Sequence, residues 1–190
     1  MARFNDIVHI ETLKRGVIPD IYVNIFKEVK EQITKVFMQD STKKIKVIDL
    51  GSGTGILSFL VKQYADEINA DIEVIAIDES KNNAEKAKTI GIDTVCSKIN
   101  NVSLNAILSV LQGADIVIAR RIMPELHSTD EKALRGIITS LLEQGSVIIG
   151  EARIYSPRTV HPLGSLKSET DYILQGSNRN AIIKGNIYII

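Results

Sequence analysis

The sequence predicts an α/β fold built on a mostly parallel sheet. Short apolar runs alternate along the chain with longer stretches of helical periodicity, and glycines or capping residues separate most of them. Strands that alternate with helices are joined by right-handed crossovers and therefore lie parallel. The last apolar runs have no helix between them, which predicts an antiparallel pair at one end of the sheet. A chain of 190 residues is long enough for one domain with a proper core.

Local signals define each expected element. Pro19 suits the first position of an amphipathic helix over residues 19–38, whose apolar residues recur at helical spacing. Ser80 and Ser103 are placed to cap later helices, and residues 128–131 have the form of a capping box. The expected strands are 45–50, 73–78, 93–96, 114–119 and 145–152, and the expected helices are 55–68, 80–90, 103–112 and 128–143.

The C-terminal part has a different pattern. Residues 153–170 contain two prolines and a glycine and are expected to form a loop, in which one short helical turn is an open alternative. Residues 172–174 and 181–190 then predict two strands joined by a turn.

Composition limits the possible functions. The hydrophobic fraction of 44% and the charged fraction of 24% are ordinary for a soluble globular protein. The net charge of zero argues against a general nucleic-acid coat, which needs a basic surface. Residues 47–150 are net acidic and both ends are net basic. Either solvated faces simply differ, or the ends form a mildly basic rim that suits an anionic substrate.

The cellular setting is expected to be cytoplasmic. The single cysteine, Cys96, allows no internal disulfide, which is consistent with a reducing compartment. Residues 1–6 lack the apolar run of a signal peptide, and no stretch approaches the ~20 apolar residues of a membrane span.

The most informative stretch is a glycine turn after the first expected strand. Residues 47–55 read Val-Ile-Asp-Leu-Gly-Ser-Gly-Thr-Gly, so that Asp49 is followed by Gly51, Gly53 and Gly55. A strand-to-helix turn of this kind lets a ligand lie directly on the backbone. The dinucleotide fingerprint Gly-x-Gly-x-x-Gly would need its third glycine at position 56, which is Ile56, and no Gly-Lys-Ser/Thr ending of a P-loop is present.

An acidic partner ends the next expected strand. Asp78 closes the run Val-Ile-Ala-Ile-Asp at residues 74–78. A carboxylate there can accept hydrogen bonds from ribose hydroxyls, and the carboxyl ends of parallel strands form the ligand crevice of an open sheet. The glycine turn and Asp78 are therefore expected to face one ligand.

These two motifs resemble those of the class I S-adenosylmethionine-dependent methyltransferases. The resemblance implies a Rossmann-like, doubly wound sheet of seven mostly parallel strands with an antiparallel C-terminal strand, here with an N-terminal helical extension. It implies S-adenosylmethionine as the cofactor. The resemblance also implies a role for each residue. The glycine turn would pass under the methionine and ribose parts of the cofactor, and Asp49 would lie near its amino group. Asp78 would bind the ribose hydroxyls, with Glu79 beside it. The cofactor-binding residues expected here are Asp49, Gly51, Ser52, Gly53, Thr54, Gly55, Asp78 and Glu79.

The expected adenine contacts depart from the family pattern. Many members carry an acidic residue shortly after the third strand, but residues 95–101 contain none. Asn100 or a backbone carbonyl is expected to serve instead, and Ile99 to pack on the adenine. Ala119, at the end of the fourth expected strand, completes the predicted cofactor set.

We expect one domain, residues 1–190, in three parts. Residues 1–44 form a helical extension, which either covers the crevice as a substrate lid or packs on the sheet edge. Residues 45–152 form the cofactor-binding core. Residues 153–190 form a substrate loop and the C-terminal strands.

The acceptor side is expected after the fourth strand, at residues 120–127. Residues 126–134 resemble a segment of small-molecule O-methyltransferases whose histidine is the general base, which makes His127 the candidate base. The tryptophan of that segment is missing, and the large N-terminal dimerisation domain of those enzymes has no counterpart in 46 residues. Removing the proton of a hydroxyl acceptor makes it a competent nucleophile, and histidine titrates near the working pH.

Each candidate residue on the acceptor side has an alternative role. His127 could be a surface residue before a helix. Arg120 and Arg121 either form ion pairs with acidic residues of helices, or one of them binds a substrate carboxylate or phosphate in a forked geometry. Glu125 either orients His127 or is solvated.

The sequence therefore predicts an S-adenosylmethionine-dependent methyltransferase that acts on oxygen or nitrogen of a small-molecule acceptor. An anionic acceptor is one of the substrates that fit this prediction. The motif Asn/Asp-Pro-Pro-Tyr/Phe of amino-methylating DNA and glutamine enzymes is absent. Two alternatives stay open: an RNA methyltransferase, which neutral charge disfavours, and a non-catalytic protein that binds the cofactor as a partner or regulatory subunit. No membrane partner and no metal are expected, and the oligomeric state is not predicted.

Overall fold

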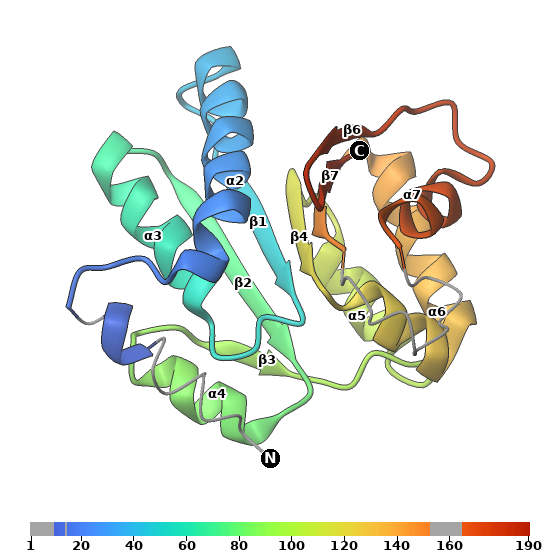
Figure 1. The fold of residues 1–190 in the computed structure, drawn as a ribbon, viewed down its shortest axis with the longest axis horizontal. Coiled ribbons are helices and arrows are strands. Elements are labelled where there is room, and N and C mark those ends of the chain that lie inside the picture. Colours follow the sequence, from blue (N-terminus) through green and yellow to red (C-terminus); the bar gives the residue numbers. More distant parts are fainter. Residues whose placement is uncertain (1–9, 14, 153–164) are drawn as a thin grey trace. The chain divides into compact units, whose positions relative to one another are not determined.

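The computed structural model describes residues 10–13, 15–152 and 165–190 (Figure 1). The chain divides into two compact units, residues 1–97 and 98–190. No helix within the described residues is both long and apolar enough to cross a membrane.

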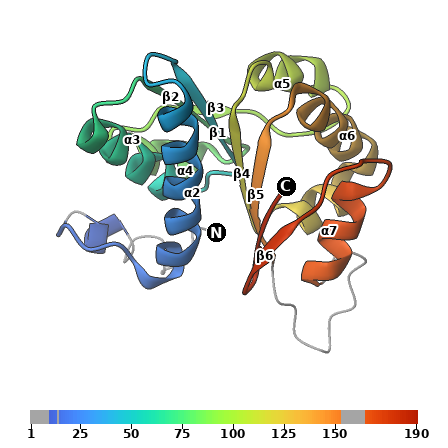
Figure 2. The same cartoon turned by 90° about the horizontal axis from the view of Figure 1, so that it is seen from above.

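The first unit is a three-stranded parallel sheet with helices on one face. Its described elements are α2 (Asp20–Gln39), β1 (Ile45–Leu50), α3 (Ile56–Ile68), β2 (Ile72–Asp78), α4 (Lys81–Lys88) and β3 (Thr94–Cys96). The strand order is β3-β2-β1, with Val47 opposite Val74 and Asp49 opposite Ala76. Both crossovers run in the same direction across the sheet, so their right-handedness brings α3 and α4 to the same face, where α2 joins them (Figure 2).

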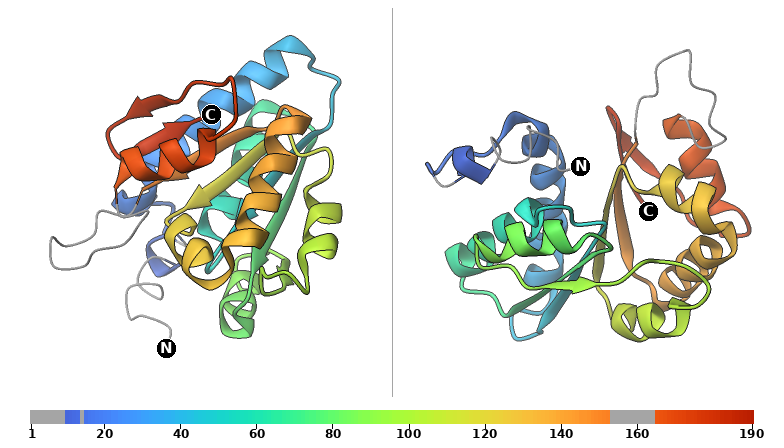
Figure 3. Two further views of the ribbon diagram at one scale, coloured as in Figure 1. Left: turned by 90° about the vertical axis from the view of Figure 1, so that its right-hand side faces the viewer. Right: turned by 90° about the horizontal axis from the view of Figure 1, so that it is seen from below.

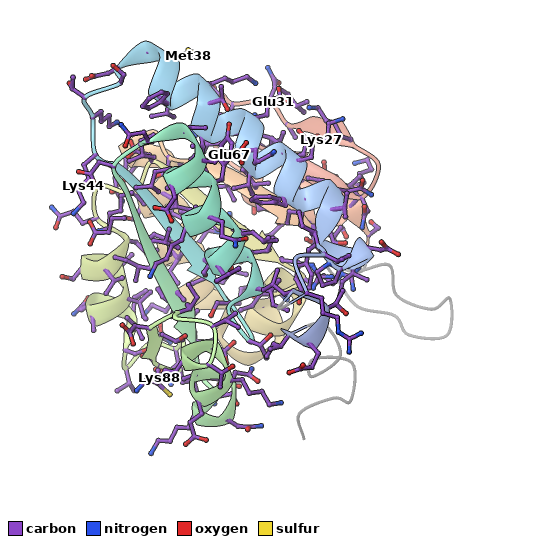
Figure 4. The ribbon with its side chains drawn as sticks, turned by 90° about the vertical axis from the view of Figure 1, so that its left-hand side faces the viewer. Lys27, Glu31, Met38, Lys44, Glu67 and Lys88 are labelled. Atoms are coloured by element: carbon purple, nitrogen blue, oxygen red, sulfur yellow. The ribbon has the colours of Figure 1, made fainter. Side chains whose placement is uncertain are left out.

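Helix α2 carries the amphipathic pattern that the sequence predicts. Ile25, Val29 and Ile33 are buried, whereas Ile21 at the first turn is 40% exposed. The opposite, charged face includes Lys27 and Glu31 and points outward (Figure 4). On the inner side, α2 packs on α3 and β1, and the hydroxyls of Thr34 and Tyr64 lie 2.7 Å apart and join the two helices. The predicted lid role of this extension stays a prediction.

The second unit is a mixed sheet. Its elements are α5 (Leu104–Leu111), β4 (Ile116–Arg120), α6 (Met123–Gln144), β5 (Val147–Glu151), α7 (Leu166–Leu174), β6 (Ile182–Lys184) and β7 (Ile187–Ile189). The strand order is β4-β5-β7-β6; β4 and β5 are parallel, and β7 is antiparallel to both of its neighbours. Helices α5, α6 and α7 lie on one face of this sheet (Figure 3). The antiparallel C-terminal strand is therefore confirmed.

Most expected boundaries lie within two residues of those observed, but the strand expected at residues 172–174 is wrong. Residues 172–174 belong to helix α7 and not to a strand. Ser165 caps this helix in a box with Ser168, and the helix buries one face through Glu169, Thr170 and Ile173. The antiparallel pair instead lies wholly within residues 182–189, where Gly185, at φ 66°, allows a two-residue hairpin turn.

Helix α6 begins earlier than predicted and is kinked. It starts at Met123, and Asp130 interrupts it with a non-helical backbone at φ −159° and ψ 83°. The Asp130 carboxylate accepts a hydrogen bond from the backbone N–H of Ala133 at 3.0 Å, which is the geometry of an N-cap. Asp130 thus caps the second part of the helix, in place of the capping box expected at residues 128–131.

Candidate functional site

The glycine turn is tied to the end of the neighbouring strand. The backbone N–H groups of Gly51 and Ser52 both donate to the carbonyl oxygen of Ile77, at 2.8 and 3.0 Å. The N–H of Gly55 then donates to the carbonyl of Ser52 at 3.0 Å, immediately before α3 begins at Ile56. These bonds fix the turn against the carboxyl end of β2.

Two glycines of the turn have different surroundings. Gly53 has φ 56°, and a Cβ built on it would meet nothing within 4 Å. Gly55 has φ 76°, and its Cβ would lie 3.0 Å from Cβ of Ala87 and 3.1 Å from Cγ2 of Ile92. Gly55 is therefore required for the packing of α3 on residues 87–92, whereas the open side of Gly53 leaves the backbone accessible to a ligand.

The Asp78 carboxylate connects the second strand to the turn. One oxygen, Oδ2, accepts from the backbone N–H of Gly53 at 2.9 Å. The other, Oδ1, accepts from the N–H of Ser80 at 2.9 Å and from the amide of Asn83 at 3.1 Å. Ser80 also caps α4, as predicted, by accepting from the N–H of Asn83. Asp78 and Gly53, separated by 25 residues in the chain, are thus brought into direct contact.

The other residues predicted in this part of the site have distinct positions. Asp49 is 2% exposed, and its Oδ2 accepts from the hydroxyl of Ser58 in α3 at 2.7 Å. Thr54 is 4% exposed. The Oγ atom of Ser52 is buried without a hydrogen-bond partner among the described residues. Glu79 is exposed directly after β2. The contact of Asp49 with an amino group stays a prediction.

The remaining predicted cofactor residues belong to the second unit. Ile99 is 7% exposed, and Ala119 is 1% exposed within β4. Asn100 has a local role: its Oδ1 accepts from the N–H of Ser103 at 3.0 Å, and its own N–H donates to the Ser103 hydroxyl at 3.1 Å. The expectation that the Ser103 side chain caps α5 is wrong, because Asn100 supplies the side-chain acceptor instead.

Both predicted arginines pair with one carboxylate at the end of the parallel strands β4 and β5. Arg120 Nε lies 2.6 Å from Oε2 of Glu151, and Arg121 Nη2 donates to Oε1 at 2.8 Å. The side-chain amide of Asn186, from the hairpin turn, also donates to Oε1 at 3.0 Å. The ion-pair role considered for the arginines is present, with a strand residue as the partner and not a helix residue.

His127 belongs to α6 and contacts a side chain of α7. Its Nε2 is 3.5 Å from a carboxylate oxygen of Glu131, four residues further along the chain. Its ring packs in a T-shaped arrangement with the ring of Tyr172 from α7, at a centroid distance of 5.1 Å. The guanidinium of Arg135 stacks over the same tyrosine ring at 3.8 Å. Burial raises the pKa of the Tyr172 phenol, an effect that the Arg135 charge opposes and the Glu131 charge supports. The side chain of Glu125 lies outside the described part of the structure.

Sequence reasoning missed several partners of these residues. Asn83 and Asn186 hold the two key carboxylates, and Tyr172 packs on His127. A Gly-Asn pair between two apolar runs is a hairpin signal, so the turn at 185–186 could have been found from the sequence. The contacts of Asn186 and Tyr172 with the site could not, because they depend on how α7 and the hairpin fold back onto β5 and α6.

Comparison with known proteins supplies the family. The methyltransferase domain family matches residues 41–184. No protein with a curated functional description matches the sequence. The chain is similar in structure to WbdD, solved with a kinase inhibitor, at a TM-score of 0.66 and 12% identity over 94% of this chain and 43% of WbdD.

Two further structures resemble this fold. The DszA carbon methyltransferase has a TM-score of 0.59 and 14% identity, over 90% of this chain and 54% of DszA. A SAM-dependent methyltransferase from Aquifex aeolicus has a TM-score of 0.50 and 17% identity, over 84% and 86% of the two chains. The chain spans about half the length or less of WbdD and DszA, and these likenesses concern the fold alone. With its matched domain and its parallel strands ending in an antiparallel β7, this chain belongs to the methyltransferase domain family and has the Rossmann-like fold of the class I S-adenosylmethionine-dependent enzymes.

Proposed function

We propose that this protein transfers the methyl group of S-adenosylmethionine to an oxygen or nitrogen atom of a small-molecule acceptor. The observation that carries the proposal is the hydrogen bond between the Asp78 carboxylate and the backbone N–H of Gly53. It joins the two segments that would contact the cofactor, the glycine turn and the acidic end of β2. A structurally similar protein from Nostoc punctiforme, described as a putative O-methyltransferase, is in keeping with an oxygen acceptor.

The residues of the turn fit the polar part of the cofactor. A carboxylate offers about four acceptor positions. Within the described residues, Asp78 accepts one hydrogen bond at Oδ2 and two at Oδ1. Oδ2 therefore keeps capacity for a ribose hydroxyl. The buried, unpartnered hydroxyl of Ser52 and the open side of Gly53 add a polar group and accessible backbone next to it.

In this proposal Asp49, residues 51–55, Asp78 and Glu79 of the first unit hold the cofactor. The contacts expected for Ile99, Asn100 and Ala119 stay predictions from the sequence. When bound, S-adenosylmethionine supplies a methyl group on a positively charged sulfur. The protein's own part is to hold the acceptor in line with that methyl group, which provides much of the rate, and to take up the acceptor's proton.

His127 is the candidate proton acceptor. The carboxylate of Glu131, 3.5 Å from Nε2, would stabilise the ring once it is protonated. Contact with the Tyr172 ring restricts the orientation of the imidazole. Only 17% of the His127 side chain is exposed, so an acceptor would reach the ring over a small accessible surface.

Thermal unfolding with S-adenosylhomocysteine tests the cofactor assignment. Ligand at a hundredfold excess over its Kd stabilises the native state by about 2.7 kcal/mol, so the wild type should gain several degrees in Tm, and NAD should give no gain. Gly53→Val and Asp78→Ala should abolish the gain. The matched control is Asp66→Ala, an exposed carboxylate on α3 of the same unit, which should keep it. A gain that survives both site changes would refute the assignment.

An activity measurement separates catalysis from cofactor binding alone. The protein would be incubated with methyl-labelled S-adenosylmethionine and a fractionated small-molecule extract, and formation of S-adenosylhomocysteine would be followed. Turnover supports the enzyme. A normal thermal response to S-adenosylhomocysteine with no turnover in any fraction would favour a non-catalytic binding protein. Turnover confined to RNA fractions, with binding that falls steeply with salt, would favour an RNA substrate.

A further inference from the structure

Arg120 and Arg121 are neighbours in the chain but differ in exposure. The Arg120 side chain is 15% exposed and the Arg121 side chain is 41% exposed, whereas the Glu151 side chain they share is 8% exposed. Arg120 is therefore part of a largely buried ion pair, and Arg121 reaches the surface from the same cluster.

The cluster contains more positive than negative charge. Glu151 accepts from Arg121 and Asn186 through Oε1, while Arg120 Nε lies against Oε2. These four side chains include two guanidinium groups and one carboxylate. Arg121 is the more exposed of the two cations, and it lies at the carboxyl ends of parallel strands. A cation in that position is suited to an anion, because ligands of open α/β sheets bind at those ends.

The backbone at Arg121 is strained and held in place. Its φ of 57° lies in the left-handed region, which residues other than glycine seldom adopt. Its N–H donates to the carbonyl of Glu151 at 3.0 Å, and its side chain donates to the carboxylate of the same residue. Strained backbone of this kind persists where surrounding contacts over-determine it, and it is concentrated at ligand sites. The two bonds to Glu151 fix the Arg121 guanidinium before any ligand binds.

We propose that Arg121 binds the anionic group of the acceptor, a carboxylate or a phosphate, and that Arg120 is the structural counter-ion of Glu151. The assignment rests on the proposed methyltransferase function and specifies its acceptor class. A guanidinium has five N–H donors in a planar fork that matches either oxyanion. A single partly exposed guanidinium on a chain of zero net charge suits a small anion better than the many phosphates of a nucleic acid.

Thermal unfolding in matched salts tests the assignment. Wild-type protein is unfolded in chloride, in acetate and in inorganic phosphate at one pH and one ionic strength, with and without saturating S-adenosylhomocysteine. At a tenfold excess over its Kd, a bound anion should raise Tm by about 3 °C relative to chloride. A gain with acetate indicates a carboxylate acceptor and a gain with phosphate a phosphorylated one. A gain with neither anion overturns the proposal.

Three variants separate the two arginines from general charge effects. Arg121→Gln should lose the anion-dependent gain. Its Tm in chloride should also fall, because it removes the hydrogen bond to Glu151, so the gain of each variant is measured relative to its own Tm in chloride. Arg120→Gln should lower the Tm in chloride, because it leaves the buried Glu151 less well paired. Lys167→Gln, which removes one positive charge from an exposed position on α7, should behave as the wild type. An unchanged gain in Arg121→Gln, or an equal loss in Lys167→Gln, would rule the site out.

A substitute variant and a second measurement complete the test. If Arg121→Gln does not fold, Arg121→Lys is used instead. It keeps the positive charge but lacks the planar guanidinium, so it should retain only part of the anion-dependent rise in Tm. The response to S-adenosylhomocysteine is recorded for every variant. A wild type that responds to S-adenosylhomocysteine but to neither anion contradicts only the acceptor class, whereas one that does not respond to S-adenosylhomocysteine contradicts the cofactor site itself.

Discussion

The ring of Tyr188 occupies the space that a side chain on Gly150 would need. The two residues are directly opposite each other on β7 and β5, and a Cβ built on Gly150 would lie 1.9 Å from Cζ of Tyr188. Tyr188 is fully buried, and burial together with the nearby Glu169 raises the pKa of its phenol well above the ordinary value. The tyrosine therefore stays neutral and fills the interior between the sheet and α7.

Gly150→Ala should destabilise the protein strongly. A methyl group cannot fit without displacing a buried ring, so the free energy of unfolding should fall by about 3 kcal/mol or more. Urea denaturation followed by circular dichroism measures the loss. In a Tyr188→Leu background, Gly150→Ala should lower the free energy of unfolding much less than it does when tyrosine is present at position 188. If Gly150→Ala lowered the free energy of unfolding equally in both backgrounds, the tyrosine ring would not be the cause of the destabilisation.

Gly53→Ala and Gly55→Ala should separate ligand binding from stability. Each places a side chain at positive φ, which costs about 1–2 kcal/mol, but only Gly55→Ala also crowds Ala87 and Ile92. The larger loss of urea stability should therefore come from Gly55→Ala. The larger loss of the thermal response to S-adenosylhomocysteine should come from Gly53→Ala, whose methyl group enters the open space beside the turn. The reverse order of the two responses would contradict the assignment of that space.

Asp130 should contribute to stability in a pH-dependent way. Hydrogen bonds from the backbone N–H groups of Ala133 and then Asn101 lower the pKa of this carboxyl below its unfolded value. The stabilisation is therefore complete above the unfolded pKa and is lost as the pH falls through the lower folded pKa. Urea midpoints of the wild type and Asp130→Ala should differ at pH 7 and converge in acid.

A matched control for that titration is Glu143→Gln, which removes one exposed negative charge from the same helix. Its midpoint should follow the wild type across the acid range. A difference between wild type and Asp130→Ala that stays constant down to the most acidic point would show that the carboxylate is not the source.

His127→Gln should lower kcat if His127 removes the acceptor's proton. Acid–base catalysis by a positioned side chain raises the reaction rate about 10²–10⁴-fold. For a hydroxyl acceptor, kcat of the variant should therefore fall by a factor in that range, with little change in KM. The measurement is steady-state methyl transfer, with an unchanged thermal response to S-adenosylhomocysteine as proof of an intact cofactor site. Full activity of the variant would exclude His127 as the base.

The elements and the cofactor motif could be predicted because their signals are local. The apolar run 45–50, the glycines that follow it and the carboxylate at the end of the next strand are read directly from sequence spacing, and β1, the turn and β2 lie where the spacing puts them. Positive φ at Gly51, Gly53 and Gly55 explains why those positions are glycine. Residues 172–174 show the limit of local signals, since a short apolar run fits a strand or a buried helix face equally well.

The sequence by itself thus determined the α/β class, the order of most elements and the methyl-donor motif, because periodicity and turn chemistry act over a few residues. Only the tertiary structure decided how the charges on the acceptor side are paired. Glu151 meets Arg121 from 30 residues earlier in the chain and Asn186 from 35 residues later. Such partners are brought together by strand pairing and by the hairpin folding back onto β5, and no spacing rule along the chain records that contact.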